Sequence, residues 1–367
     1  MSDLDTPPAP YLAPEDQTVV NEFAASGEPP LQDLSVQEFR KFFDQLQEHT
    51  PIPGVTETEI KVPFGAKGKE FVKTFIFRAD NTVGDLPVIF YIHGGGWISG
   101  DHISYDSISR ELALRSGCAV VFPEYTLAPE KKFPVQNEQC FTALKYVAKH
   151  GKSLGLKTEK FAIAGDSAGG QLSPAVINLV NEAKLEKSIP IVFQILFNPF
   201  VDVSNLPNNL TLSEFEFVNG PFLTLGLTEE VIHDYIPNPK DRKSILASPL
   251  LMTKEQVSHQ PPTMVVVSEV DVLRTGGEQF AKLLQTSGVR CGLVRAEAQL
   301  HDPVVIEPIR NGPTAHALVL MAAALFNEAL APSPTAGVKR PREEENSDKE
   351  KQIKKVRKVA HKRRRRS

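Results

Sequence analysis

Residues 165–170 read Gly-Asp-Ser-Ala-Gly-Gly and directly follow the apolar run of residues 161–164. This order predicts a strand that ends in a sharp turn carrying Ser167 and then opens into a helix. Such a turn strains the backbone, and we expect the small residues around Ser167 to relieve that strain. The turn exposes the Ser167 hydroxyl above a sheet and points the first N–H groups of the helix at whatever reacts there.

A second glycine-rich segment lies about 70 residues upstream. The apolar residues 87–92 run directly into His93-Gly94-Gly95-Gly96-Trp97. Three consecutive glycines leave backbone N–H groups uncovered by side chains, and fixed N–H groups of this kind can stabilise an oxyanion by roughly 3–4 kcal/mol per donor. A plain glycine-rich turn is the alternative reading, and the strand before the glycines and the turn after them favour the oxyanion site.

Strand-like and helix-like segments alternate through the middle of the chain. Segments with helical spacing cover residues 138–149, 171–184 and 276–286, between apolar runs that predict strands at residues 71–77, 87–92, 119–122, 161–164, 191–196, 264–268 and 292–295. Alternation of this kind predicts an α/β fold whose mostly parallel central sheet has helices on both faces.

The motifs resemble those of the hormone-sensitive-lipase-like branch of the α/β-hydrolases, in chain order over roughly residues 55–328. The resemblance implies an α/β-hydrolase fold, and it implies that His93 and Asp166 brace the glycine loop. It rests on the segments 93–97, 124–130 with 133–134, 165–170, 247–250, 261–262 and 271–274.

For this fold the catalytic groups should follow the order Ser, Asp or Glu, then His, each after a strand. After Ser167, the strand at 264–268 is followed by Glu269 and Asp271, and the strand at 292–295 is followed by a loop with His301. Asp271 matches the family motif, while Glu269 stays a rival for the same role. Among the other histidines we expect His316 to be a core residue of a helix, and we favour His301 over it and over two further candidates, His233 and His259.

Three residues depart from the family pattern. Thr275 follows Arg274 where the family usually has Asp, and Asp302-Pro303 follows His301 where the family usually has a small residue and then Phe. Asp302 therefore adds a carboxylate near the predicted base. We expect these departures to affect the leaving-group side of the pocket and the optimum pH, and to leave the reaction type unchanged.

Two segments outside the alternating strands and helices are expected to form a cap. Residues 16–48 read as amphipathic helix, and residues 205–240 carry several aromatic residues between strands. The predicted organisation is an N-terminal cap segment (1–50), a catalytic domain (51–330) with a cap insertion (205–240), and a disordered basic tail (331–367).

Charge divides the chain into two parts. Residues 339–367 carry fourteen Lys and Arg against five Asp and Glu, a net of +9, which leaves −13 for the rest of a chain whose total is −4. The tail has no aromatic residue and cannot bury a core, so disorder is expected. Basic runs of this kind attract importins, anionic lipids and phosphate backbones alike, so the tail is a candidate nuclear-import or polyanion-binding arm.

The remaining composition excludes several classes of protein. No stretch reaches the roughly 18–20 apolar residues of a membrane span, and the N-terminus lacks the features of a secretory signal. Three scattered cysteines, Cys118, Cys140 and Cys291, suit a reducing compartment, so we expect a cytoplasmic protein that the tail can direct to the nucleus. No metal-ligand spacing, phosphate loop or dinucleotide fingerprint is present, so neither metal nor cofactor is expected. The sequence does not determine the oligomeric state.

The favoured function is hydrolysis of small to medium, largely uncharged esters. Ser167 is the expected nucleophile, His301 the base and Asp271 its orienting group, with the oxyanion held by the N–H groups of Gly95, Gly96 and Ala168. A lactonase, deacetylase or amidase using the same residues is an alternative. A non-catalytic small-molecule receptor on this fold is another, and the presence of all three catalytic groups argues against it.

Overall fold

The apolar runs of the sequence form one eight-stranded sheet in a computed structural model that describes residues 10–206 and 210–332. The strand order is β1-β2-β4-β3-β5-β6-β7-β8; β2 pairs antiparallel with both β1 and β4, and the remaining neighbours are parallel. The strands are β1 (Val55–Phe64), β2 (Glu70–Ala79), β3 (Leu86–Ile92), β4 (Ala119–Glu124), β5 (Leu156–Asp166), β6 (Ile191–Phe197), β7 (Thr263–Ser268) and β8 (Cys291–Ala296).

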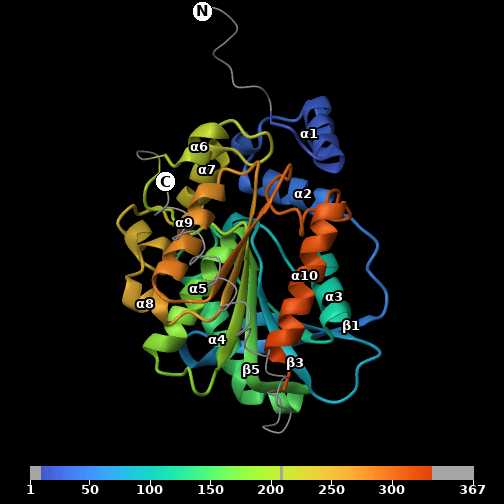
Figure 1. Cartoon of the computed structure of the whole chain (residues 1–367), viewed down its shortest axis with the longest axis vertical. Helices are drawn as coiled ribbons and strands as arrows, with labels where there is room; N and C mark the ends of the chain where they lie inside the picture. The colour runs from blue at the N-terminus through green and yellow to red at the C-terminus, as the bar shows by residue number, and fades with distance from the viewer. Residues whose placement is uncertain (1–9, 207–209, 333–367) are drawn as a thin grey trace, which may run out of the picture. The chain divides into compact units, whose positions relative to one another are not determined.

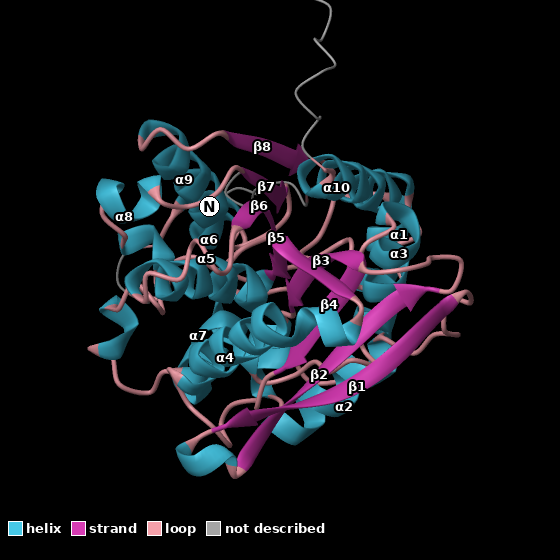
Figure 2. Cartoon of the chain, turned by 90° about the horizontal axis from the view of Figure 1, so that it is seen from below, coloured by secondary structure: helices cyan, strands magenta, loops and turns pink. Residues whose placement is uncertain are grey.

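Helices cover both faces of this sheet, so the predicted α/β-hydrolase fold is confirmed. Figure 2 shows α3 and α10 on one face and α4, α5, α8 and α9 on the other. The helices are α1 (Pro14–Ser26), α2 (Val36–Leu46), α3 (Asp106–Ser116), α4 (Val135–His150), α5 (Ser167–Glu182), α6 (Leu212–Glu216), α7 (Leu225–Tyr235), α8 (Lys254–Ser258), α9 (Arg274–Thr286) and α10 (Pro313–Leu330).

The central strands are buried on both faces, as a parallel sheet requires. Every residue from Val88 to Ile92 in β3 and from Phe161 to Asp166 in β5 is buried. Because a parallel sheet collects the carboxyl ends of its strands along one edge, the turns after β3, β5, β7 and β8 meet there. That edge is where the candidate active-site residues gather.

The N-terminal segment and the insertion lie together over this edge. Figure 1 shows α1 and α2 at the same end of the molecule as α6 and α7. The helical segment expected over residues 16–48 forms two helices. Helix α1 ends at the cap residue Gly27, where φ is +71° and two prolines follow, and α2 begins with a Ser35–Glu38 capping box. The two segments touch where Thr224 Oγ1 lies 3.1 Å from Gln32 Oε1.

By length and composition, helix α10 is apolar enough to cross a membrane. One helix of this kind is only marginal, so the described residues contain no clear membrane span. The buried residues of α10, which include Val319, Ala322 and Phe326, face α3 and the sheet, as in the core helix of a globular domain.

The predicted basic tail lies outside the described residues, except for Ala331 and Pro332. Its disorder and its part in nuclear import or polyanion binding stay predictions from the sequence.

Candidate active site

Ser167 lies at the junction of β5 and α5, in the strand–turn–helix context that the sequence indicates. Its φ of +48° is strained for a residue with a side chain, and the backbone is held there by the hydrogen bond from Phe200 N to Ser167 O (3.0 Å). The nearby glycines serve close packing rather than strain relief: a Cβ on Gly169 would clash with the carbonyl oxygen of Ile92. The turn thus presents the Ser167 hydroxyl at the edge of the sheet.

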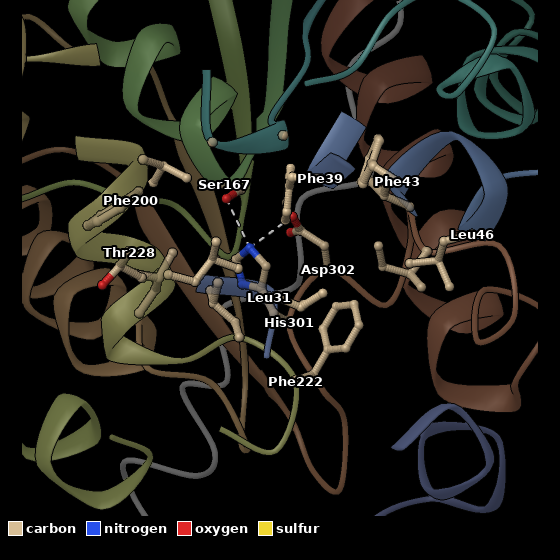
Figure 3. A pocket seen from close by; sticks show the side chains of 18 of the residues that line it. Leu31, Phe39, Phe43, Leu46, Ser167, Phe200, Phe222, Thr228, His301 and Asp302 are labelled. Atoms are coloured by element: carbon tan, nitrogen blue, oxygen red, sulfur yellow. Dashed lines mark hydrogen bonds and ion pairs between the residues drawn. The ribbon is translucent and has the colours of Figure 1, made fainter. Parts of the chain in front are cut away.

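His301 connects Ser167 to a carboxylate. The loop between β8 and α10 places His301 Nε2 2.9 Å from Ser167 Oγ and His301 Nδ1 2.9 Å from Asp271 Oδ2 (Figure 3 shows the first contact). With Nδ1–H donating to the carboxylate, Nε2 is left to accept the proton of the serine hydroxyl. The structure therefore brings all three predicted catalytic residues into one hydrogen-bonded chain.

Asp271 is held by two further donors. The Asn198 side-chain amide donates to Asp271 Oδ2 (2.8 Å), and the N–H of Leu273 donates to Oδ1 (2.9 Å). Sequence reasoning missed Asn198, although a polar residue directly after the buried run of β6 is a signal that could have found it. These bonds fix the carboxylate so that it faces the imidazole.

The rival carboxylate points elsewhere. Glu269 Oε2 accepts a hydrogen bond from the N–H of Ala298 (2.7 Å), which ties the β7 turn to the loop before His301. His316 is exposed on α10, so the expectation that it is a core residue is wrong, and its Nδ1 lies 3.8 Å from Glu111. Within the described residues, Asp271 and His301 are therefore the carboxylate and the histidine that are hydrogen-bonded in a chain to Ser167.

The glycine loop packs directly against the serine turn. Gly95 and Gly96 line the same cavity as Ser167, and a Cβ on Gly94 would clash with Asp166. The N–H of Gly94 donates to the Tyr105 hydroxyl (3.1 Å). Ala168 is the second residue of α5, where backbone N–H groups have no acceptor within the helix. The three predicted oxyanion donors are therefore close to the nucleophile.

Two buried side chains brace this loop. The ring of His93 stacks on that of Tyr125 (centroids 4.0 Å apart), whose hydroxyl donates to the carbonyls of His93 and Gly94. Burial lowers the pKa of His93 to about 4, so this ring is neutral near pH 7. Asp166 accepts hydrogen bonds from the hydroxyls of Tyr91 (2.9 Å) and Tyr105 (3.0 Å). Both residues contact the loop as the family resemblance implies.

The cavity beside Ser167 is small and mostly apolar. Its volume is about 80 Å³, and half of the residues that line it belong to the cap. The cap residues that line it are Leu31, Phe39, Phe42, Phe43, Leu46, Phe222, Leu223, Leu227, Thr228 and Val231. Other aromatic residues expected in the cap lie outside this cavity: Phe215 is largely exposed, and Tyr235 is buried against Trp97.

The N-terminal segment is tied to both active-site loops by side chains that sequence reasoning did not find. Asp16 accepts from the N–H of Leu300 (2.7 Å) and from Gln299 (3.1 Å), next to His301. Arg40 donates to the carbonyl of Ile98 (2.6 Å), after the glycine loop, and pairs with Glu130. No local pattern marks these residues, because their partners are distant in the sequence.

Asp16 gives this anchor a pH dependence. Burial raises the pKa of Asp16 to about 6, although its hydrogen bonds from the Leu300 N–H and from Gln299 favour the carboxylate. Because the pKa is higher in the folded than in the unfolded chain, the stability that the protonated form contributes is lost as pH rises from about 4 to 6. We therefore expect the free energy of unfolding of D16N, relative to that of the native chain, to be higher at pH 7 than at pH 4.5. Urea unfolding at both pH values measures this difference. The exposed Asp33 in D33N is the control, and an equal trend in both variants would contradict this assignment.

No group of three or more His, Cys, Asp or Glu side chains in the described ranges is arranged to hold a metal ion.

Comparison with known proteins agrees with this architecture. Residues 89–304 match a family model described as α/β-hydrolase fold. An esterase of Gibberella moniliformis is 37% identical over 283 residues, which span 76% of this chain and 86% of that protein. The crystal structure of a thermostable esterase from Pseudomonas putida superposes with a TM-score of 0.83 at 31% identity, covering 89% of this chain and all of the other. The carboxyl esterase 2 of Tuber melanosporum gives 0.78 at 33% identity, covering 87% and 100% of the two chains. The chain belongs to the α/β-hydrolase family, in the hormone-sensitive-lipase-like branch that its motifs resemble.

Proposed function

We propose that this protein is a serine carboxylesterase that uses Ser167, His301 and Asp271 on small to medium, largely uncharged esters. The observation that carries the proposal is the hydrogen-bonded chain of these three side chains at the wall of an apolar cavity. Relatives across most of the chain's length are esterases, which supports the same reaction class.

The geometry supports a two-step acyl transfer. Ser167 Oγ attacks the acyl carbon while His301 Nε2 takes its proton, and Asp271 stabilises the imidazolium that forms. The N–H groups of Gly95, Gly96 and Ala168 hold the oxyanion, each donor contributing roughly 3–4 kcal/mol. Nε2 then gives its proton to the leaving alcohol, and a water molecule releases the acyl group by the same route in reverse.

The cavity size argues for short chains. An apolar cavity of roughly 150 Å³ holds one benzene molecule, and the cavity beside Ser167 has about half that volume. Phe42, Leu46 and Phe222 separate it from a larger outer cavity of about 610 Å³, because these three residues line both. A long chain can therefore reach the outer cavity only past these side chains.

We expect kcat/KM for p-nitrophenyl esters to be highest between acetyl and hexanoyl and to fall at least about tenfold by dodecanoyl. Each methylene that enters apolar surroundings contributes about 0.8 kcal/mol of binding free energy. That gain ends at the wall formed by Phe42, Leu46 and Phe222. F222A opens the wall and should move the optimum to longer chains. The matched control is F215A, in the same cap segment but exposed. If no ester is turned over, the alternative of a non-catalytic small-molecule receptor is favoured. If the optimum chain length is unchanged in F222A, Phe222 does not limit the length of the acyl chain.

A further inference from the structure

Asp302 places a second carboxyl group at the catalytic nitrogen. Its Oδ2 lies 3.0 Å from His301 Nε2, almost the same distance as Ser167 Oγ, and both contacts are drawn in Figure 3. Asp302 is buried and lines the substrate cavity. The mechanism above gives this group no role, although it touches the atom that must accept the serine proton.

The contact requires a proton. An ionised carboxylate and the lone pair of a neutral Nε2 are both acceptors and repel each other at this distance. Either the imidazole is charged and Nε2–H donates to Asp302, or the acid is protonated and donates to Nε2. In both arrangements the Nε2 lone pair that must accept the Ser167 proton is already bound to a proton or accepts a hydrogen bond from Asp302.

A second buried acid adds to the negative charge at this point. Asp166 interacts electrostatically with both Asp302 and His301. Burial raises the pKa of Asp166 well above its usual value, and the negative charge of Asp302 raises it further. Asp166 is in turn held by Tyr105, whose hydroxyl also accepts from the N–H of Gly94. Hydrogen bonds thus run from Asp166 through Tyr105 to the glycine loop.

The other groups that face His301 set the direction of the effect. Two of them are carboxyl groups at the ends of strands, Asp271 after β7 and Asp166 of β5, and Asp166 is hydrogen-bonded to Tyr91 and Tyr105. Asp16 of α1 accepts a hydrogen bond from the N–H of Leu300, next to His301. The side chains that α2 and α7 present to the cavity are mainly apolar. Burial opposes the charge on His301, but the carboxylates of Asp271 and Asp302 outweigh it and raise the pKa of the imidazole well above its usual value.

We propose that Asp302 is a positioning residue that holds the protonated form of His301 by accepting a hydrogen bond from Nε2, so that Nε2 becomes available to Ser167 only after this proton has passed to the solvent. The inference rests on the proposed role of His301 as the base. It makes Asp302 a determinant of the lowest pH at which the esterase works.

The first test is the pH profile of kcat/KM for p-nitrophenyl acetate. An opposite charge this close shifts a titration by about 1–3 units, so D302N should move the acidic fall-off at least about one unit lower. D302G is the second variant, because glycine accommodates the φ of +54° at this position. E307Q, which removes a charge from the same loop without touching His301, should leave the profile unchanged.

A titration without turnover separates this inference from the proposed function. The ¹³Cε1 signal of His301, assigned by its loss in H301Q, can be followed against pH in S167A with and without D302N. We expect the midpoint to be at least about one unit lower in the double variant. An unmoved midpoint and an unmoved profile would overturn the role of Asp302, even if Ser167 proves to be the nucleophile. A shifted midpoint in a protein whose Ser167 is dispensable for turnover would instead leave the Asp302–His301 pair in place and reject the mechanism.

Discussion

Replacing Ser167 with alanine is expected to lower kcat/KM for p-nitrophenyl acetate by at least about 10⁴-fold while the protein stays folded. The loss is large because the three groups act as a unit, and without the hydroxyl there is no atom to form the acyl-enzyme. The measurement is steady-state hydrolysis together with thermal unfolding of both proteins.

The control for this substitution is S173A. Ser173 is a second buried serine of α5, whose hydroxyl donates to the carbonyl of Gly169 (2.8 Å). We expect S173A to keep activity within about threefold. Retained activity in S167A, or an equal loss in S173A, would contradict the assignment of Ser167.

The second large effect concerns the base and its carboxylate. H301A should lose about as much activity as S167A, and D271N should lose about 10⁴-fold, since the amide no longer selects the tautomer that leaves Nε2 free. E269Q should stay within tenfold, because Gln can still accept the Ala298 N–H through its side-chain carbonyl. The measurement is kcat/KM at the pH optimum of each variant.

The comparison between D271N and E269Q shows which of the two carboxylates orients the base. Both substitutions remove one negative charge near the end of β7, but only Asp271 contacts His301. A damaging E269Q with a mild D271N would mean that Glu269 orients the base and that the observed hydrogen bond is not the functional one.

Elements with a strong local signal could be predicted from the sequence. The seven apolar runs correspond to β2–β8. Most residues of the central strands β3–β7 are buried between two layers of helices, so few of them are polar, whereas β8, at the edge of the sheet, is only partly buried. The turn at Ser167 and the loop after β3 were recognisable for the same reason: both depend on small residues at fixed places next to a strand.

Elements without such a signal were missed. Strand β1 lies at the edge of the sheet and is largely exposed on both faces, so its sequence, rich in Thr and charged residues, does not show the apolar run of a central strand. The interruption between α1 and α2 was also missed, although Gly27, Pro29 and Pro30 are breaker residues that could have indicated it.

The support of the site was beyond sequence reasoning for a different reason. Asp16 and Leu300 are 284 residues apart, and the partners of Arg40 lie 58 to 90 residues away. Nothing in the neighbourhood of either residue distinguishes an anchor from an ordinary charged residue of a solvated helix. Asp302 was noticed as a departure from the family pattern, but its contact with His301 Nε2 appears only in the folded chain.

Covalent labelling tests the central claim, that Ser167 is an activated nucleophile, most directly. The protein is incubated with a diethyl phosphoryl ester, and the product is analysed by intact mass and by peptide mapping. We predict one adduct per chain, on the peptide that contains Ser167, with complete loss of esterase activity and no adduct in S167A. An adduct on another residue, or full ester turnover in a protein that takes up no label, would contradict the account.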